Sequence, residues 1–368
     1  MPVRPTRAEI STVRSGLRSD LEALKDAFLR ACDRVGVVER DVLIAGFRIR
    51  LVAAGSRLLD ELWPAVAHRA VTDRPNLDGR GAGEVADLTI SLWDSASSAV
   101  PLPDIPWMGA PEDEEPRTIR VARGHDLRMS YRASEHELVA LDDRTNEAFL
   151  WMPGPDRVSI HVCGAPFLVI LHWWMRSRGV HPIHGGAVGG SGGGVLLVGR
   201  GGSGKSTTAV SCLLDGMSYA SDDYVALVGS GNAPAALSMY CTAKLDPAQA
   251  ARFPELQPAI RTGSPADEKV LAFVEGFMPD RVIDGFPIRA ILAPKVTGAT
   301  STTVQRLRPA ETLTALAPST LLGGLPLPDP TAFAAMAEAV RRVPGFRLDL
   351  GSDLSTIAPT VRDVLEDQ

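Results

Sequence analysis

Hydrophobic residues recur along this chain with two different periods, and the period changes from segment to segment. In residues 17–35, leucine, phenylalanine and alanine fall near one helical face and charged residues on the other, which predicts an amphipathic packing helix. Residues 41–53 instead alternate apolar side chains with Arg48 and Arg50, which predicts a pair of half-buried strands bent at Gly46. The chain therefore mixes helices and strands from its first residues onward.

The rest of the first half follows the same rules. Ser56 can cap a helix over residues 57–69, which Pro64 must shorten or kink because proline lacks a backbone N–H. Residues 100–118 are rich in proline and acidic side chains, which favours a surface loop or linker and leaves open a strip that recognises an acceptor. The other predicted elements are strands over residues 87–93, 117–122, 126–132, 137–141 and 147–152, and a largely buried helix over residues 163–178.

The second half continues as strands and helices punctuated by glycine and proline. Residues 254–267 favour a loop, which is a candidate lid or acceptor clamp. Strands are predicted over residues 224–228, 235–245, 288–294, 302–307 and 346–350, and helices over residues 206–214, 309–322, 331–342 and 353–366. The pattern as a whole predicts an α/β fold.

Length and composition set the number of domains and exclude several classes of protein. The chain has 368 residues, 45% of them hydrophobic and 22% charged, which predicts two domains able to bury a substantial core. We expect an α+β region for acceptor recognition or assembly over residues 1–160, and the α/β core over residues 161–368. A net charge of −6 argues against nucleic-acid or membrane-surface partners. Scattered cysteines and the lack of an apolar N-terminal segment favour a cytoplasmic protein.

Residues 199–206 (GRGGSGKS) fit the phosphate-binding pattern G-x-x-x-x-G-K-[ST]. An apolar run before them and a helical run after them place this loop at a helix N-terminus, where backbone N–H groups favour an anion. Lys205 is expected to reach the β- and γ-phosphates of ATP, and the Ser206 hydroxyl to ligate Mg²⁺. The expected nucleotide-binding residues are Gly199, Arg200, Gly201, Gly202, Ser203, Gly204, Lys205, Ser206 and Thr207.

Two features separate this loop from the ordinary nucleotide-binding kind. Residues 186–188 and 195–198 flank a run of glycines, which predicts that the strand before the loop is the second arm of a β-hairpin. The acidic pair Asp222-Asp223 begins an apolar strand rather than ending one. Because adjacent strand residues face opposite sides, both carboxylates can serve one site only if the backbone there is irregular. One is expected to hold Mg²⁺ and the other to accept a hydroxyl proton.

His184-Gly185, the glycine hairpin, the loop and Ser221-Asp222-Asp223 together resemble the core of the HPr serine kinase/phosphorylase family, which shares its nucleotide site with phosphoenolpyruvate carboxykinases. The close resemblance covers about residues 182–228. The chain also resembles the HPr-kinase-related proteins of bacterial biosynthetic clusters, including those that phosphorylate lasso peptide precursors. The E-x-R-G signature of the family is absent, with Glu275-Gly276 its remnant, so neither HPr as substrate nor the phosphorylase reaction is expected.

The resemblance implies a P-loop core with a mixed, partly antiparallel sheet, and an ATP-dependent kinase that phosphorylates serine or threonine of a peptide or carrier protein. It also implies a homo-oligomer. The implied catalytic residues are Asp222, Asp223, Lys205 and His184, and the implied Mg²⁺ ligands are Ser206, Asp222 and Asp223. Two alternatives stay open: a small-molecule kinase with the same core, and a non-catalytic nucleotide-binding switch or assembly protein.

A second cation near the transferred phosphoryl group is desirable, because charge spreads over its oxygens in the transition state. His184 is expected either to touch the phosphates or to be structural, and Arg200 either to reach phosphate or to face solvent. His172, which precedes two tryptophans, indicates packing, and Asp142-Asp143 indicate a solvated turn. The candidates for the second cation, each of which also fits a surface charge, are Lys244, Arg281, Arg289 and Lys295.

Overall fold

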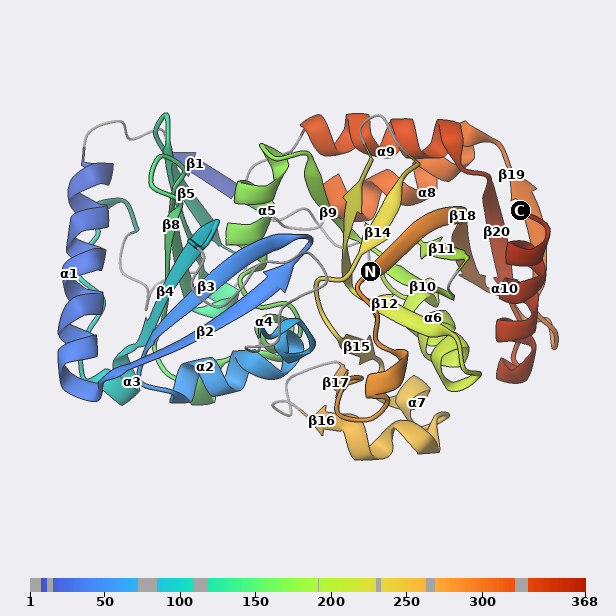
Figure 1. Ribbon diagram of the computed structural model, residues 1–368, viewed down its shortest axis with the longest axis horizontal. Coiled ribbons are helices and arrows are strands. Elements are labelled where there is room, and N and C mark those ends of the chain that lie inside the picture. Colours follow the sequence, from blue (N-terminus) through green and yellow to red (C-terminus); the bar gives the residue numbers. More distant parts are fainter. Residues whose placement is uncertain are drawn as a thin grey trace. The chain divides into compact units, whose positions relative to one another are not determined.

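The computed structural model describes the chain in two compact units, Met1–Trp174 and Met175–Gln368, each a mixture of helices and strands (Figure 1). The expected mixed α/β class is therefore confirmed. The described residues are 8–11, 16–71, 85–108, 118–190, 192–229, 233–262, 269–321 and 330–368. Part of the segment over residues 100–118, the end of the loop over residues 254–267 and residue 322 of a predicted helix lie outside them.

The first unit is built on one mixed sheet. Its spatial order is β1-β5-β6-β7-β8-β4-β3-β2, with parallel pairs at β1–β5, β3–β4 and β4–β8 and antiparallel pairs elsewhere. The predicted bend at Gly46 is the turn of the β2–β3 hairpin, where the backbone has positive φ. The strands are β1 (Ala8–Ser11), β2 (Val37–Ile44), β3 (Phe47–Ala54), β4 (Leu88–Asp94), β5 (Ile119–Arg123), β6 (Leu127–Arg132), β7 (Glu137–Asp142) and β8 (Glu147–Met152).

Helix α1 (Leu17–Val35) spans the predicted residues and packs its apolar face on the first sheet. Its Phe28 ring lies 6.3 Å from that of Trp93, in a core cluster that includes residues of β6, β7 and β8. Two short helices follow in sequence, α2 (Arg57–Leu62) and α3 (Ser95–Ser98).

Three details of the first unit differ from the predictions. Ser56 makes no side-chain cap bond to α2, which ends at Leu62 and continues as 3₁₀ turns around Pro64. The predicted helix over residues 163–178 is two helices, α4 (Ile160–Gly164) and α5 (Leu168–Arg176), because the chain turns at Phe167 with φ +60°. Asp142 is buried and paired with Arg18, so the acidic pair there is structural rather than a solvated turn.

The division between the units lies beyond the boundary expected after residue 160. Helices α4 and most of α5 belong to the first unit, where Trp174 Nε1 donates to Asn146 Oδ1 at 2.9 Å. The Trp174 ring also meets Phe47 edge-on, with centroids 4.9 Å apart. Both partners are far from Trp174 in sequence, so the local pattern of residues 163–178 did not reveal which unit this helix joins.

The second unit is built on a larger mixed sheet, in which β12-β10-β11-β18-β14-β13-β9 are neighbours and β20 pairs with β18 and β19. The predicted hairpin is present as the antiparallel pair β10–β11. Strand β18 connects the antiparallel part of the sheet, through its pairing with β14, to β11 and β20, with which it is parallel. The strands are β9 (Val180–His184), β10 (Gly186–Gly190), β11 (Gly193–Leu197), β12 (Ser218–Ser221), β13 (Tyr224–Val228), β14 (Ala235–Leu237), β18 (Gly285–Val296), β19 (Thr303–Leu307) and β20 (Gly345–Leu350).

Helices cover both faces of this sheet. Val195 and Leu197 of β11 pack in one cluster with α6 (Lys205–Leu214) and α10 (Ile357–Glu366). Leu196, between them, packs in the other cluster with α8 (Pro309–Leu321) and α9 (Pro330–Arg342). Figure 1 shows α8 and α9 on one side of the sheet and α6 on the other. Because β11 is buried on both faces, its side chains on both faces must be apolar, which explains the continuous apolar run before the loop.

The predicted strand over residues 235–245 is wrong, because this segment forms two strands that join different sheets. Strand β14 ends at Leu237 and pairs with β18, whereas β15 (Thr242–Leu245) enters a small sheet of order β15-β17-β16. The small sheet also contains β16 (Ile260–Thr262) and β17 (Val270–Phe273), and α7 (Pro247–Ala250) follows β15. Among the helices of the described residues, none is both long and apolar enough to cross a bilayer.

Candidate functional site

The glycine-rich loop runs from the end of β11 to the first turn of α6, as expected. Gly199, Gly202 and Gly204 have φ values of +138°, +77° and +103°, a region that side chains with a Cβ disfavour. A Cβ on Gly204 would also lie 2.2 Å from Leu350 Cδ1. Gly204 therefore requires glycine for both backbone conformation and space, whereas Gly202, where a Cβ would meet nothing within 4 Å among the described residues, requires it for conformation alone.

Lys205 is the first residue of α6 and curls back over the loop. Its ammonium donates to the carbonyl oxygens of Gly199 at 2.9 Å and Arg200 at 3.2 Å, and the side chain is buried. Burial lowers the pKa of Lys205, while the charges of Asp222 and Asp223 act in the opposite direction. This buried ammonium donates to neutral carbonyls. An anion would stabilise it more than these carbonyls do, because hydrogen bonds between charged groups are stronger.

The N-terminus of α6 faces the pocket with its amides uncapped by a side chain. The N-cap is Gly204, which makes no side-chain cap bond, while Thr208 Oγ1 donates to the Gly204 carbonyl at 2.8 Å. The N–H groups of a first helical turn have no partner within the helix, and the helix dipole adds a partial positive charge there. Together with Lys205, this end of α6 has the properties of an anion-binding site.

The acidic pair lies where the chain changes its strand partner. Strand β12 pairs with β10 and ends at Ser221, whereas β13 pairs with β9 and begins at Tyr224. Between them Asp223 has φ +66°, and its carbonyl accepts a hydrogen bond from Gly185 N at 3.1 Å. The backbone is thus irregular at the pair, as it must be for neighbouring carboxylates to serve the same site.

Asp222 is completely buried beside the loop. Neither of its carboxylate oxygens accepts a hydrogen bond of normal geometry from the residues that the structure describes. Burial raises the pKa of Asp222, and the nearby Ser206 hydroxyl opposes this shift. A buried carboxylate without a partner is costly unless a cation or proton joins it. A carboxylate next to a hydroxyl at a phosphate-binding loop fits Mg²⁺, which is held by one or two such oxygens together with phosphate and water.

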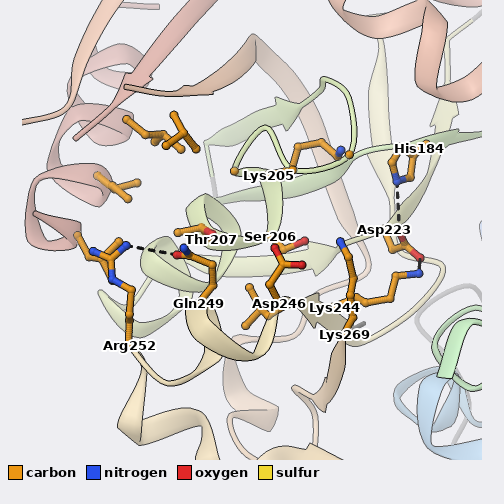
Figure 2. Close-up of a pocket in the computed structure, with 18 of the residues that line it drawn as sticks. His184, Lys205, Ser206, Thr207, Asp223, Lys244, Asp246, Gln249, Arg252 and Lys269 are labelled. Carbon is orange, nitrogen blue, oxygen red and sulfur yellow. Dashed lines mark hydrogen bonds and ion pairs between the residues drawn. The ribbon is translucent and has the colours of Figure 1, made fainter. Parts of the chain in front are cut away.

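Asp223, in contrast, lines the pocket and is fixed by two basic side chains (Figure 2). Its Oδ2 lies 2.6 Å from Lys244 Nζ, and its Oδ1 lies 3.3 Å from His184 Nε2. Burial raises the pKa of Asp223, but the charge of Lys244 and the contact with His184 outweigh burial and hold the pKa well below its usual range. The structure therefore presents an ionised carboxylate in a fixed orientation to the pocket.

The pocket has a charged end and a largely apolar end, with the loop between them. Figure 2 shows His184, Asp223 and Lys244 on one side of Ser206 and Arg252 on the other. Arg252 donates to the Ser352 carbonyl at 2.6 Å, which places it beside the apolar lining contributed by the end of β20 and the start of α10. The remaining lining residues are Gly201, Gly202, Gly204, Lys205, Thr207, Leu245, Asp246, Gln249, Lys269, Val296, Leu350, Gly351, Leu354 and Ile357.

The structure brings together most of the residues expected from the sequence. His184, Lys205, Ser206, Thr207 and Asp223 line one pocket with three loop glycines, and Lys244 is the one proposed second cation that joins them. Asp222 lies behind this surface. Within the described residues, the expected loop residues that do not line the pocket are Gly199, Arg200 and Ser203, and the cation candidates that do not line it are Arg281, Arg289 and Lys295.

Some lining residues were not anticipated from the sequence. They are far from the loop in sequence: Asp246, Gln249 and Arg252 belong to the segment that follows β15, and Lys269 directly precedes β17. No spacing relative to the loop marks them, so only the tertiary arrangement identifies them. In the described part of the chain, no group of three or more histidine, cysteine, aspartate or glutamate side chains is arranged to hold a metal ion.

No protein-family model matches this chain, and no curated protein matches it either. Among solved structures, the chain is similar to the HPr(Ser) kinase/phosphatase from Coxiella burnetii, with 12% sequence identity and a TM-score of 0.29. The similarity covers 51% of this chain and 92% of that one. At this identity and TM-score the similarity leaves the function to be inferred from the residues of the pocket.

Proposed function

We propose that this protein is an ATP-dependent kinase that transfers the γ-phosphate to a hydroxyl group. The observation that carries the proposal is the meeting of three features in one place: a lysine-containing glycine loop, a buried carboxylate beside Ser206, and an ionised carboxylate at Asp223. The first suits a triphosphate, the second Mg²⁺, and the third an incoming hydroxyl. A site that only bound nucleotide would not need the third.

The two ends of the pocket differ in polarity, and this difference favours one orientation of the bound nucleotide. The apolar lining near Arg252 suits a base, which has apolar faces and polar edges. The loop amides suit the α- and β-phosphates and Lys205 suits the β- and γ-phosphates, so the terminal phosphate then lies toward Asp223. This direction brings the reacting phosphorus to the carboxylate rather than away from it.

Ser206 and Asp222 are the residues that would hold Mg²⁺. The metal ion, when bound, would neutralise charge on the phosphate oxygens and fix their geometry. Asp223 is less suited to this role, because Lys244 and His184 already occupy its two oxygens. We therefore assign the metal to Asp222 and the acceptor to Asp223, a choice that the sequence left open.

The transfer then follows from the positions of these groups. The acceptor hydroxyl donates a hydrogen bond to Asp223, and its oxygen forms a bond to the γ-phosphorus as the bond to the β,γ-bridging oxygen breaks. The proton passes to the carboxylate and then to water, and ADP leaves. An ionised carboxylate with a lowered pKa is a weak base, so Asp223 acts mainly by orienting the hydroxyl in a loose transition state. Lys205 and the α6 amides stabilise the charge on the phosphates.

The acceptor that the resemblance to HPr serine kinases favours is a serine or threonine of a peptide or carrier protein. To test the proposal, purified protein is incubated with γ-labelled ATP and cell extract, and the label is followed into peptide, metabolite and free phosphate. We expect label on a peptide or protein that survives acid, as a serine or threonine phosphoester does. Label on a metabolite would support the small-molecule kinase instead. Label only in free phosphate would contradict a kinase and leave a nucleotide-hydrolysing switch.

A further inference from the structure

The pocket contains more positive charge than the loop itself supplies. Lys205 belongs to the loop and Lys244 is paired with Asp223, but a third lysine, Lys269, also lines the pocket. Lys269 directly precedes β17, and Lys244 lies on β15, its antiparallel neighbour. The small sheet therefore brings two lysines to the same end of the pocket.

Lys269 and Lys244 differ in what holds them. Lys244 is fixed by Asp223 at 2.6 Å, whereas the half-buried Lys269 has neither an ion pair nor a hydrogen bond to any residue that the structure describes. Figure 2 shows the Lys269 side chain extending from the small sheet toward the space between Ser206 and Asp223. Lys269 is thus directed at the place where the terminal phosphate would lie.

The ammonium of Lys269 is also close enough to Lys205 to affect it. After burial, which is the main cause, the charge of Lys269 contributes to the lowered pKa of Lys205. Two like charges that face one pocket destabilise each other unless an anion lies between them. A phosphate bound by the loop would supply that anion and turn the repulsion into two attractions.

We propose that Lys269 binds the γ-phosphate of the nucleotide and remains on the phosphoryl group as it moves to the acceptor. This inference rests on the proposed kinase function and adds the second cation that such a transfer needs. Lys205 approaches the phosphates from the loop, and Lys269 approaches from the opposite wall. The charge on the three equatorial oxygens of the transferred group is then neutralised from both sides.

The test compares two nucleotides that differ only in the γ-phosphate. Calorimetry measures the affinity of the full chain for Mg²⁺ with ADP and for Mg²⁺ with the β,γ-imido analogue of ATP. In Lys269→Met, we expect the affinity for the analogue to fall about 10- to 100-fold, the loss typical of a charged hydrogen bond, while the affinity for ADP changes less than about threefold. Lys269→Arg should recover most of the lost affinity.

Lys25→Met is the matched control, because Lys25 is a half-buried lysine like Lys269, but it lies on α1, is paired with Glu147 and lines no part of the pocket. It should bind both nucleotides as the parent does. Equal affinities of Lys269→Met and the parent for the imido analogue would overturn the role of Lys269, as would an equal loss for both nucleotides. A parent chain that binds neither nucleotide would instead contradict the proposed function itself.

Discussion

Lys244 Nζ lies 2.6 Å from Asp223 Oδ2, within a pocket that the first residues of α6 also line. The contact joins two elements that are separate in the fold, because Asp223 follows β12 of the large sheet and Lys244 belongs to β15 of the small one. It neutralises a buried carboxylate and fixes the direction of its oxygens. Lys244 is therefore a positioning residue, which acts on an acceptor through Asp223.

Lys244→Met should make the activity sensitive to acid. Burial raises the pKa of Asp223 and Lys244 is the largest influence that lowers it, so without this lysine the pKa rises. A carboxylate that must be ionised loses function as pH falls through its pKa. We expect phosphate transfer from MgATP by Lys244→Met to fall as the pH is lowered from 7 to 5, because a carboxylate with a raised pKa becomes protonated in that direction.

The parent chain and Lys244→Arg serve as controls for this profile. In both, Asp223 keeps a cationic partner, so no loss of activity caused by Asp223 is expected above about pH 4, the ordinary pKa of an aspartate. Identical pH profiles for Lys244→Met and the parent would show that Lys244 does not set the ionisation of Asp223.

The two adjacent aspartates should fail in different ways when each is changed to asparagine. Asp223→Asn should reduce transfer from MgATP at least about 100-fold and leave nucleotide affinity within about threefold, because it removes the carboxylate that orients the acceptor. Asp222→Asn should raise the Mg²⁺ concentration needed for half-maximal activity, because it removes the anion beside Ser206. Titrating Mg²⁺ at saturating ATP separates the two, and equal Mg²⁺ dependence in both variants would refute the assignment.

The hairpin before the loop requires glycine at one position and tolerates a side chain at another. A Cβ on Gly194 would lie 2.3 Å from the Phe286 ring and 2.5 Å from the Val188 carbonyl oxygen. We expect Gly194→Ala to lower the free energy of unfolding by about 1–3 kcal/mol in urea denaturation, the usual cost of overpacking. Gly190→Ala is the control, since a Cβ there meets nothing within 4 Å among the described residues, and it should change stability by less than about 0.5 kcal/mol. Equal stabilities of the two variants would contradict the packing described for the hairpin.

His68, in the first unit, should make the stability of the chain fall in mild acid. Burial lowers its pKa from 6.5 to about 3, with a smaller contribution from the charge of Arg69. Below about pH 6.5 the unfolded chain therefore binds a proton that the folded chain does not, and stability falls as pH drops toward 3. The expected loss at pH 5 is about 2 kcal/mol. His68→Gln should lose that much less stability between pH 7 and pH 5, and parallel losses in the two proteins would exclude this role.

Local features of the fold were predictable because short-range periodicity determines them. The apolar stripe of α1 predicts where this helix begins and ends, and the glycines between β10 and β11 predict the hairpin. The loop between β11 and α6 followed from one motif and its flanking runs. Each of these predictions depends on residues fewer than about twenty positions apart, where spacing carries the information.

The errors arise where distant residues decide the outcome. The pattern of residues 235–245 predicts one strand, although β14 and β15 join different sheets. Asp222 and Asp223 are interchangeable in the sequence pattern, whereas in the structure the backbone has positive φ at Asp223, Asp222 is buried and Asp223 lines the pocket. Lys269 carries no local signal, because the small sheet alone brings it to the loop.

Calorimetric titration of MgATP into the parent chain and into Lys205→Ala bears on the nucleotide site itself. Lys205 lies within the loop and donates to the carbonyls of Gly199 and Arg200, so its ammonium is placed to meet bound phosphate. We expect one site per chain in the parent and an affinity about 10- to 100-fold lower in Lys205→Ala, with unchanged circular dichroism. No heat of binding in the parent, or equal affinity in Lys205→Ala, would contradict a nucleotide site at this loop.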